Sequence, residues 1–187
     1  AMEKKVFIEV VGTTPANGRR KDPVWEELGM AVYQKCLDCK SVIAFSEGRR
    51  YAEKLAYYVN LLGGDGFARV HHGSLSKEQR AEVEQELREG RLRLLCATSS
   101  MELGIDVGDI DQVLQIGCPR TVSSTMQRLG RAGHNPGSVS VMYMYPRTAP
   151  ESVYCGMTAE TARLGGVEHT KPPRMCLDVL AQHLVSM

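Results

Sequence analysis

Two arginines near the end of a predicted helix are suited to stabilising negative charge on a phosphate group. Residues 127–134 read QRLGRAGH, so Arg128 and Arg131 stand three positions apart, which predicts that they share one helical face. The guanidinium group is a planar fork that fits phosphate oxygens. Arginine pairs on helices are usually solvated or salt-bridged, but Gly130 and Gly133 cost helix stability, which favours a packing or ligand role for this segment.

Short polar residues follow two apolar segments upstream. Residues 97–106 read ATSSMELGID, and three consecutive hydroxyl side chains at a strand end could contact a phosphate backbone. In the same segment Gly104 permits a backbone conformation that other residues resist, and Asp106 could accept a hydrogen bond from a ribose hydroxyl. Residues 71–76 read HHGSLS, where Gly73 would let backbone amides approach a phosphate. Taken singly, each feature also fits a turn or a helix cap.

The motifs of several self-sufficient hydrolytic sites are missing from the sequence. There is no G-x-x-x-x-G-K-[ST] phosphate loop, no G-x-S-x-G elbow and no H-E-x-x-H pair. Cys36 and Cys39 form the only C-x-x-C, and no second pair at zinc-finger spacing follows. We therefore assign no metal ligand and expect two thiols near a helix end, with zinc or a thioredoxin-like redox pair as minority alternatives.

The composition is that of an ordinary soluble domain. The 187 residues include 23 Lys and Arg against 22 Asp and Glu, so the net charge is +1 and nucleic-acid binding must come from a local site. Apolar residues make up 43% and charged residues 24%. No apolar run of about 18 residues could span a membrane, and the N-terminus lacks the apolar core of a signal peptide. We expect a cytoplasmic protein with reduced cysteines.

Six short apolar segments rich in Val, Ile and Leu predict buried strands of a mainly parallel sheet, which is covered on both faces. They span residues 6–11, 41–45, 67–71, 92–97, 112–116 and 138–143. Helical patterns alternate with them, at 25–37, 52–62, 77–89, before 130, after Pro150 and at 177–185. This order predicts an α/β fold. Ligands of such sheets bind beyond the carboxyl ends of the strands, where the polar segments above lie.

Together these segments resemble the second-lobe motifs of superfamily 2 helicases, in the right order. The matching segments are 42–50 for motif IV, 71–80 for the adjoining phosphate-binding segment, 97–106 for motif V and 127–134 for motif VI. Three strings narrow the resemblance to the large helicase-related (Lhr) family: TSSMELGID at 98–106, GRAGH at 130–134 and LDVLAQ at 177–182.

The resemblance implies the architecture and the catalytic roles. It implies a RecA-like three-layer sandwich over residues 1–168, and at 169–187 a linker and the start of a winged-helix-like domain. ATP would lie between two lobes, and the first lobe would supply the phosphate loop and hold Mg²⁺. This lobe would supply Arg131 as the arginine finger. The other residues that the resemblance assigns to the nucleotide site are the supporting Arg128 and Gln127, and the ATP-binding Gly104, Asp106 and His134.

The resemblance also implies a nucleic-acid strand across the tops of the lobes. The residues that would hold its phosphates are Ser46, Arg49, Arg50, Gly73, Ser74, Thr98 and Ser99. We see no aromatic stacking platform in these loops, which favours a sequence-independent grip on the backbone.

The implied protein is an ATP-dependent 3′-to-5′ helicase or translocase on single-stranded DNA, associated with a bacterial or archaeal nucleoid. Its partners would be the first lobe and the downstream domains of the same chain, with no membrane involved, and the lone lobe would not hydrolyse ATP. Two alternatives stay open: RNA or a DNA–RNA hybrid as the substrate, and a non-catalytic RecA-like binding module.

Overall fold

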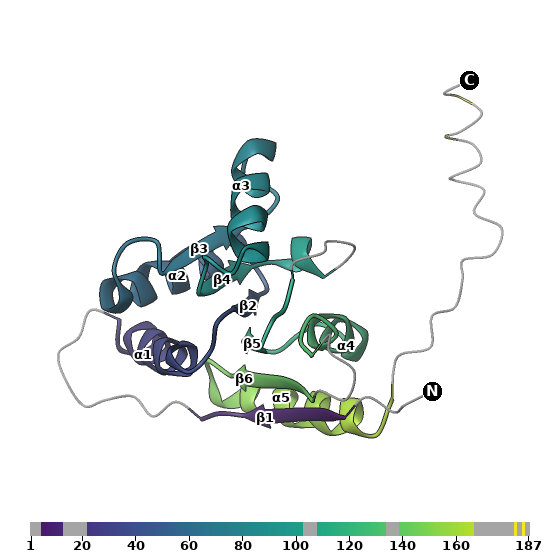
Figure 1. Cartoon of the computed structure of the whole chain (residues 1–187). Helices are drawn as coiled ribbons and strands as arrows, with labels where there is room; N and C mark the ends of the chain where they lie inside the picture. The colour runs from purple at the N-terminus through teal and green to yellow at the C-terminus, as the bar shows by residue number, and fades with distance from the viewer. Residues whose placement is uncertain are drawn as a thin grey trace.

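Six parallel strands form one sheet in the order β1-β6-β5-β2-β4-β3 (Figure 1). The computed structural model describes residues 5–12, 22–102, 108–133 and 139–166, with single positions at 182 and 185. The strands are β1 (Val6–Val10), β2 (Val42–Ser46), β3 (Ala68–His71), β4 (Leu94–Ala97), β5 (Gln112–Ile116) and β6 (Ser140–Tyr145). Every apolar segment predicted as a strand is one, so the predicted parallel sheet is confirmed.

Five α-helices lie within the described ranges, together with one short 3₁₀ turn. They are α1 (Pro23–Leu37), α2 (Arg49–Gly63), α3 (Lys77–Arg88), α4 (Val122–Leu129), α5 (Ala149–Arg163) and the 3₁₀ turn η1 (Ser99–Met101). The sequence explains three of the starts, because Ser76, Thr121 and Thr148 each accept a hydrogen bond from a backbone N–H in the first turn of α3, α4 and α5.

The helices cover both faces of the sheet. Alternate residues of each strand point to opposite faces, so Val42 and Ala44 pack with α1 and α2, whereas Ile43 and Phe45 pack with α3, α4 and α5. Figure 1 shows α1 and α2 on one side of the sheet and α4 on the other. The predicted three-layer RecA-like sandwich is confirmed.

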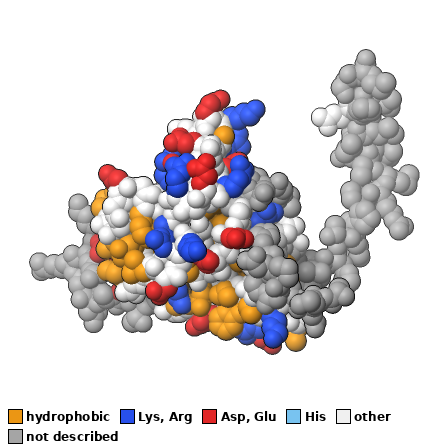
Figure 2. Space-filling view, in the orientation of Figure 1, with side chains coloured by type: hydrophobic (Ala, Val, Ile, Leu, Met, Phe, Trp, Pro, Cys, Tyr) orange, Lys and Arg blue, Asp and Glu red, His pale blue; other side chains and the backbone are white. Residues whose placement is uncertain are grey.

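Helix α3 projects from the body of the molecule. Figure 2 shows acidic and basic side chains mixed along it. Only Val83 and Leu87 are buried, as the dense charge pattern at 77–89 predicts for a helix with two apolar anchors. Within the described ranges, no helix combines the length and the hydropathy needed to cross a bilayer.

The carboxyl ends of the strands gather the segments that could carry chemistry. Strand β2 ends at Ser46, β3 at His71 and β4 at Ala97. Strands β2 and β5 are neighbours, but β2 leads into α2 on one face and β5 leads into α4 on the other. Such a reversal creates a crevice beyond the strand ends, which is where open α/β sheets bind ligands.

Our expectation that Arg128 and Arg131 share one helical face is wrong. Helix α4 ends at Leu129, and the chain continues in tight turns in which the Arg131 N–H donates to the Arg128 carbonyl oxygen. Glycine has low helix propensity, so Gly130 is a natural end for the helix. The predicted helix at 177–185 and the predicted boundary at 168 fall almost wholly outside the described residues.

Candidate functional site

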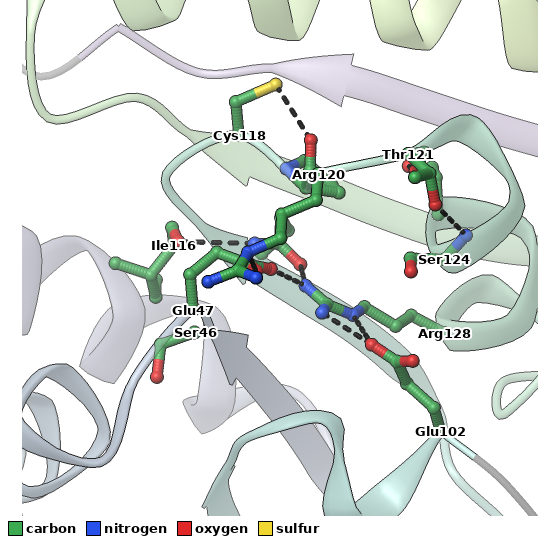
Figure 3. Close-up of polar contacts among 12 residues, drawn as sticks. Ser46, Glu47, Glu102, Ile116, Cys118, Arg120, Thr121, Ser124 and Arg128 are labelled. Atoms are coloured by element: carbon green, nitrogen blue, oxygen red, sulfur yellow. Dashed lines mark hydrogen bonds and ion pairs between the residues drawn. The ribbon is translucent and has the colours of Figure 1, made fainter. Parts of the chain in front are cut away.

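A pocket of about 220 Å³ lies at the crevice beyond β2, β4 and β5. The segments that follow the three strand ends line it together with α4, as Figure 3 shows for Glu47, Glu102, Arg120 and Arg128. The lining residues are Ser46, Glu47, Thr98, Ser99, Glu102, Arg120, Ser124 and Arg128. The fold therefore brings together motif IV, motif V and motif VI, which are distant in the sequence.

Arg128 is the most buried charged residue of this pocket, with 2% of the residue exposed. Its Nη1 donates to Glu47 Oε1 at 2.6 Å, and its Nε donates to Glu102 Oε1 at 2.7 Å (Figure 3). The same Nη1 lies 2.6 Å from Gln115 Oε1, and the guanidinium stands 5.2 Å from the centre of the Phe45 ring. A buried guanidinium is tolerated because carboxylates compensate it. Arg128 thus joins the loops after β2 and β4 to α4.

Arg131 is held by the same loop after β4. Its Nη2 donates to the backbone oxygen of Glu102 at 2.6 Å, and the residue is half-buried. Glu102 therefore contacts Arg128 through its carboxylate and Arg131 through its carbonyl oxygen. Gln127, in the last turn of α4, is exposed. The three residues expected to bind ATP (Gly104, Asp106 and His134) lie outside the described residues.

The residues expected to hold strand phosphates divide into exposed and buried members. The Arg49 Nη1 donates to Ser74 Oγ at 3.0 Å and so links the start of α2 to the loop after β3. Arg50, Gly73, Ser74 and Ser99 are exposed, and Thr98 is half-buried. Ser46 is only 1% exposed, and its hydroxyl donates to the Gly48 carbonyl oxygen at 3.3 Å.

The first turn of α2 is strongly electropositive. Its N-cap is Gly48, which has no side chain to satisfy the free N–H groups, and the next two residues are Arg49 and Arg50. No acidic residue lies in this first turn. Cations at the positive end of a helix dipole are locally unfavourable. A bound anion would be attracted both by the helix N-terminus and by the two arginines. This arrangement favours a phosphate ligand.

Two buried histidines fix the loop after β3. The His71 ring bridges Glu84 of α3, at 2.8 Å, and Ser100 Oγ, at 2.9 Å. The His72 ring contacts Glu53 of α2 at 3.1 Å. These contacts set the loop that carries Gly73 and Ser74 against three other segments.

The C-x-x-C pair lies at the carboxyl end of α1. Cys36 is buried in α1, and burial raises the pKa of its thiol to about 12, so the thiol stays protonated near neutral pH. Burial also raises the pKa of Cys39. In the part of the chain that the structure describes, no three His, Cys, Asp or Glu residues are grouped to hold a metal ion.

Sequence reasoning missed four residues that line the pocket, Glu47, Glu102, Arg120 and Ser124. It also missed Gln115, which accepts a hydrogen bond from Arg128. Two were inside the recognised motifs but were given no role. A usable signal was the position of Glu47, Glu102 and Arg120, each of which lies within five residues after the end of a predicted strand.

Comparison with known proteins decides the family. The sequence model described as "Helicase conserved C-terminal domain" matches residues 28–135. The chain belongs to this helicase family. It is the second RecA-like lobe of a superfamily 2 helicase, and its similarity to Lhr proteins confirms the resemblance seen in the motifs.

Several curated relatives of this helicase lobe carry the name Lhr. A Lhr helicase and probable uracil glycosylase of Mycolicibacterium smegmatis is 48% identical over 120 residues, which are 64% of this chain and 8% of that protein. The Lhr helicase/uracil glycosylase of Escherichia coli is 38% identical over 198 residues, covering 89% of this chain and 13% of that protein. The chain thus spans a small part of these relatives.

Solved structures of helicases share the fold of the lobe. The structure of Mycobacterium smegmatis helicase Lhr bound to ssDNA and AMP-PNP superposes with a TM-score of 0.91 and 38% identity, over 98% of this chain and 25% of that one. The helicase MrfA bound to DNA superposes with a TM-score of 0.75 and 23% identity, over 95% of this chain and 26% of that one. The MrfA likeness concerns the fold alone.

Proposed function

We propose that this lobe is part of an Lhr-type, ATP-dependent helicase or translocase that moves 3′ to 5′ along single-stranded DNA. The observation that carries the proposal is that Arg128 lines the crevice and Arg131 contacts Glu102 of the same crevice, beside segments with exposed basic and hydroxyl side chains. The M. smegmatis Lhr structure, which holds ssDNA and AMP-PNP, supports it at 38% identity.

In this proposal Arg131 is the arginine finger. ATP lies between two lobes, and the first lobe supplies the phosphate loop and holds Mg²⁺. The Arg131 guanidinium donates to oxygens of the phosphoryl group as negative charge develops there, an effect worth about 10³–10⁵ in rate in related chemistry. Arg128 and Gln127 support the site, and Gly104, Asp106 and His134 contact the nucleotide. This lobe alone does not hydrolyse ATP.

The strand lies over the exposed side chains at the carboxyl edge of the sheet. Arg49, Arg50, Ser74 and Ser99 hold successive phosphates, together with Gly73 and Thr98. Such contacts position a strand without reading its bases. Ser46 reaches a phosphate only by giving up its hydrogen bond to the Gly48 carbonyl. Closure of the lobes on ATP and their opening after hydrolysis move the strand.

RNA is the second candidate substrate. The contacting groups at this edge recognise backbone phosphates, which DNA and RNA share. We place the end of the lobe at residue 168, with a linker and the start of a winged-helix-like domain at 169–187, and we place the protein in the cytoplasm.

The test is ATP turnover by the full natural protein, with and without single-stranded DNA, beside its Arg131→Ala variant. We expect DNA-stimulated turnover that falls by about 10³ in the variant. Arg91→Ala is the matched control, because Arg91 is an exposed arginine paired with Glu89 at the amino end of β4. Undiminished turnover in Arg131→Ala would show that Arg131 is not the arginine finger. No turnover, or turnover indifferent to both DNA and Arg131, would leave a RecA-like fold used for binding. Stronger stimulation by RNA than by DNA would make RNA the substrate.

A further inference from the structure

One carboxylate in the pocket is shared by two arginines of very different exposure. Glu47 Oε1 lies 2.6 Å from the Nη1 of Arg128, whose side chain is 2% exposed. Glu47 Oε2 lies 3.4 Å from the Nε of Arg120, whose side chain is 82% exposed. Figure 3 shows Arg120 extending from the loop between β5 and α4 across Glu47.

Glu47 connects the strand-binding loop to the finger. It follows Ser46 directly, in the short connection between β2 and α2, and Arg49 is the first residue of α2. On its other side, a series of contacts runs from Glu47 to Arg128, from Arg128 to the carboxylate of Glu102, and from the carbonyl oxygen of Glu102 to Arg131. Each of these contacts is a hydrogen bond of 2.6–2.7 Å.

The two ion pairs of Glu47 differ in strength for a physical reason. The pair with Arg128 is short and buried, and breaking it leaves an uncompensated charge in the interior. The pair with Arg120 is long and exposed, so water and salt screen it and little is lost when it opens. A strand phosphate offers Arg120 a full charge and several acceptor oxygens in exchange.

We propose that Glu47 is a positioning residue that couples strand binding to the placement of Arg131, and that Arg120 is a further phosphate contact which leaves Glu47 when a strand binds. With Arg120 gone, both oxygens of Glu47 are available to Arg128, and the loop after β2 is drawn toward α4. Glu47 thus has two states, one paired with Arg120 and one without it, and both strand binding and nucleotide binding shift the balance between them. The inference rests on the proposed motor function.

The test measures the coupling between strand and nucleotide directly. In the full natural protein, the Kd for single-stranded DNA is measured with and without AMP-PNP, and the ratio of the two values is the coupling factor. Glu47→Gln keeps the shape of the side chain and an acceptor for Arg128 but removes the charge. We expect it to lower the coupling factor by about fivefold or more.

Two further variants separate coupling from structure. Glu82→Gln is the control, because Glu82 is an exposed carboxylate that pairs with Arg69 away from the pocket, and its coupling factor should equal that of the unchanged protein. Arg120→Gln, at an exposed position, should fold normally. We expect it to lower the coupling factor and to reduce the slope of log Kd against log salt by about one phosphate contact.

The outcomes distinguish failure of the Glu47 inference from failure of the proposed motor function. A coupling factor in Glu47→Gln equal to that of Glu82→Gln, with Arg120→Gln also unchanged, overturns the inference and leaves the motor intact. A natural protein that binds no single-stranded DNA, or that shows no coupling to AMP-PNP, overturns the motor function and the inference with it. A Glu47→Gln variant that unfolds leaves the decision to Arg120→Gln, which must then lower both the coupling factor and the salt slope.

Discussion

Arg128 and Arg49 lie at the same edge of one sheet, but their surroundings give them opposite uses. The Arg128 side chain is 2% exposed and is paired with two carboxylates. Arg49 is exposed, donates to the neutral hydroxyl of Ser74, and stands at the uncapped start of α2. One region is a compensated interior cluster, and the other is an electropositive surface with no carboxylate in its first helical turn.

The difference shows that the partners of an arginine decide its role. A buried guanidinium with carboxylate partners holds segments together, and its removal leaves charges uncompensated. An exposed guanidinium contributes little to folding and keeps its donors for a ligand. The carboxyl edge of the sheet therefore combines a compensated interior cluster, which contacts Arg131 through Glu102, with an exposed surface that costs little to rearrange on binding.

Removal of the buried arginine should have the largest effect on stability. Arg128→Met leaves Glu47 and Glu102 without their shared cation, and we expect the free energy of unfolding to fall by about 3–5 kcal/mol. Urea denaturation of the 187-residue chain measures it. Arg120→Met is the control, and its exposed pair should cost less than about 1 kcal/mol. Equal losses in the two variants would contradict the claim that burial decides how much an arginine of this cluster contributes to stability.

The cap of α4 should have an intermediate effect. The Thr121 hydroxyl accepts a hydrogen bond from the Ser124 N–H at 3.0 Å, and α4 carries Arg128. Thr121→Ala should lower the free energy of unfolding by about 1 kcal/mol. Thr148→Ala removes the matching cap of α5 and should cost about the same. In the full natural protein only Thr121→Ala should also reduce DNA-stimulated turnover. Equal turnover in the two variants would show that α4 does not position the site.

A capping residue at Gly48 should give the smallest change in stability. It should stabilise the fold slightly and weaken DNA binding. Gly48→Ser would supply α2 with a capping hydroxyl, and its Cβ would stand 3.7 Å from Tyr51 without a clash. We expect a gain of about 0.2–0.5 kcal/mol in unfolding free energy. The same hydroxyl would occupy backbone N–H groups in the first turn of α2, where the charge arrangement favours a phosphate, so the Kd for single-stranded DNA should rise. Tighter DNA binding by this variant would contradict the assignment.

The strands and helices could be predicted because their signals are local. The apolar runs that became β2 and β5, and the stripe that became α2, depend on residues within about ten positions of one another. Proximity of the motifs followed from one rule, that the carboxyl ends of parallel strands share an edge.

The partners of Arg128 could not be predicted, because they come from distant segments. Glu47 is 81 positions away from Arg128 and Glu102 is 26 positions away. No periodic pattern indicates which of many glutamates will compensate a buried arginine. The burial of Ser46 was missed for a related reason, since the last residue of a central strand looks the same in the sequence whether its hydroxyl is free or occupied. The roles of both arginines came from resemblance.

The most direct test of the division between the two regions compares Arg131→Ala with Arg49→Ala in the full natural protein. For each variant, kcat at saturating single-stranded DNA and the Kd for that DNA are measured. We predict that Arg131→Ala lowers kcat by about 10³ and leaves the Kd within about threefold. Arg49→Ala should instead raise the Kd and reduce its salt dependence by about one phosphate contact, with kcat nearly unchanged. If both variants change the same quantity, or if Arg131→Ala turns over at the normal rate, the assignment of catalysis to one region and strand binding to the other is wrong.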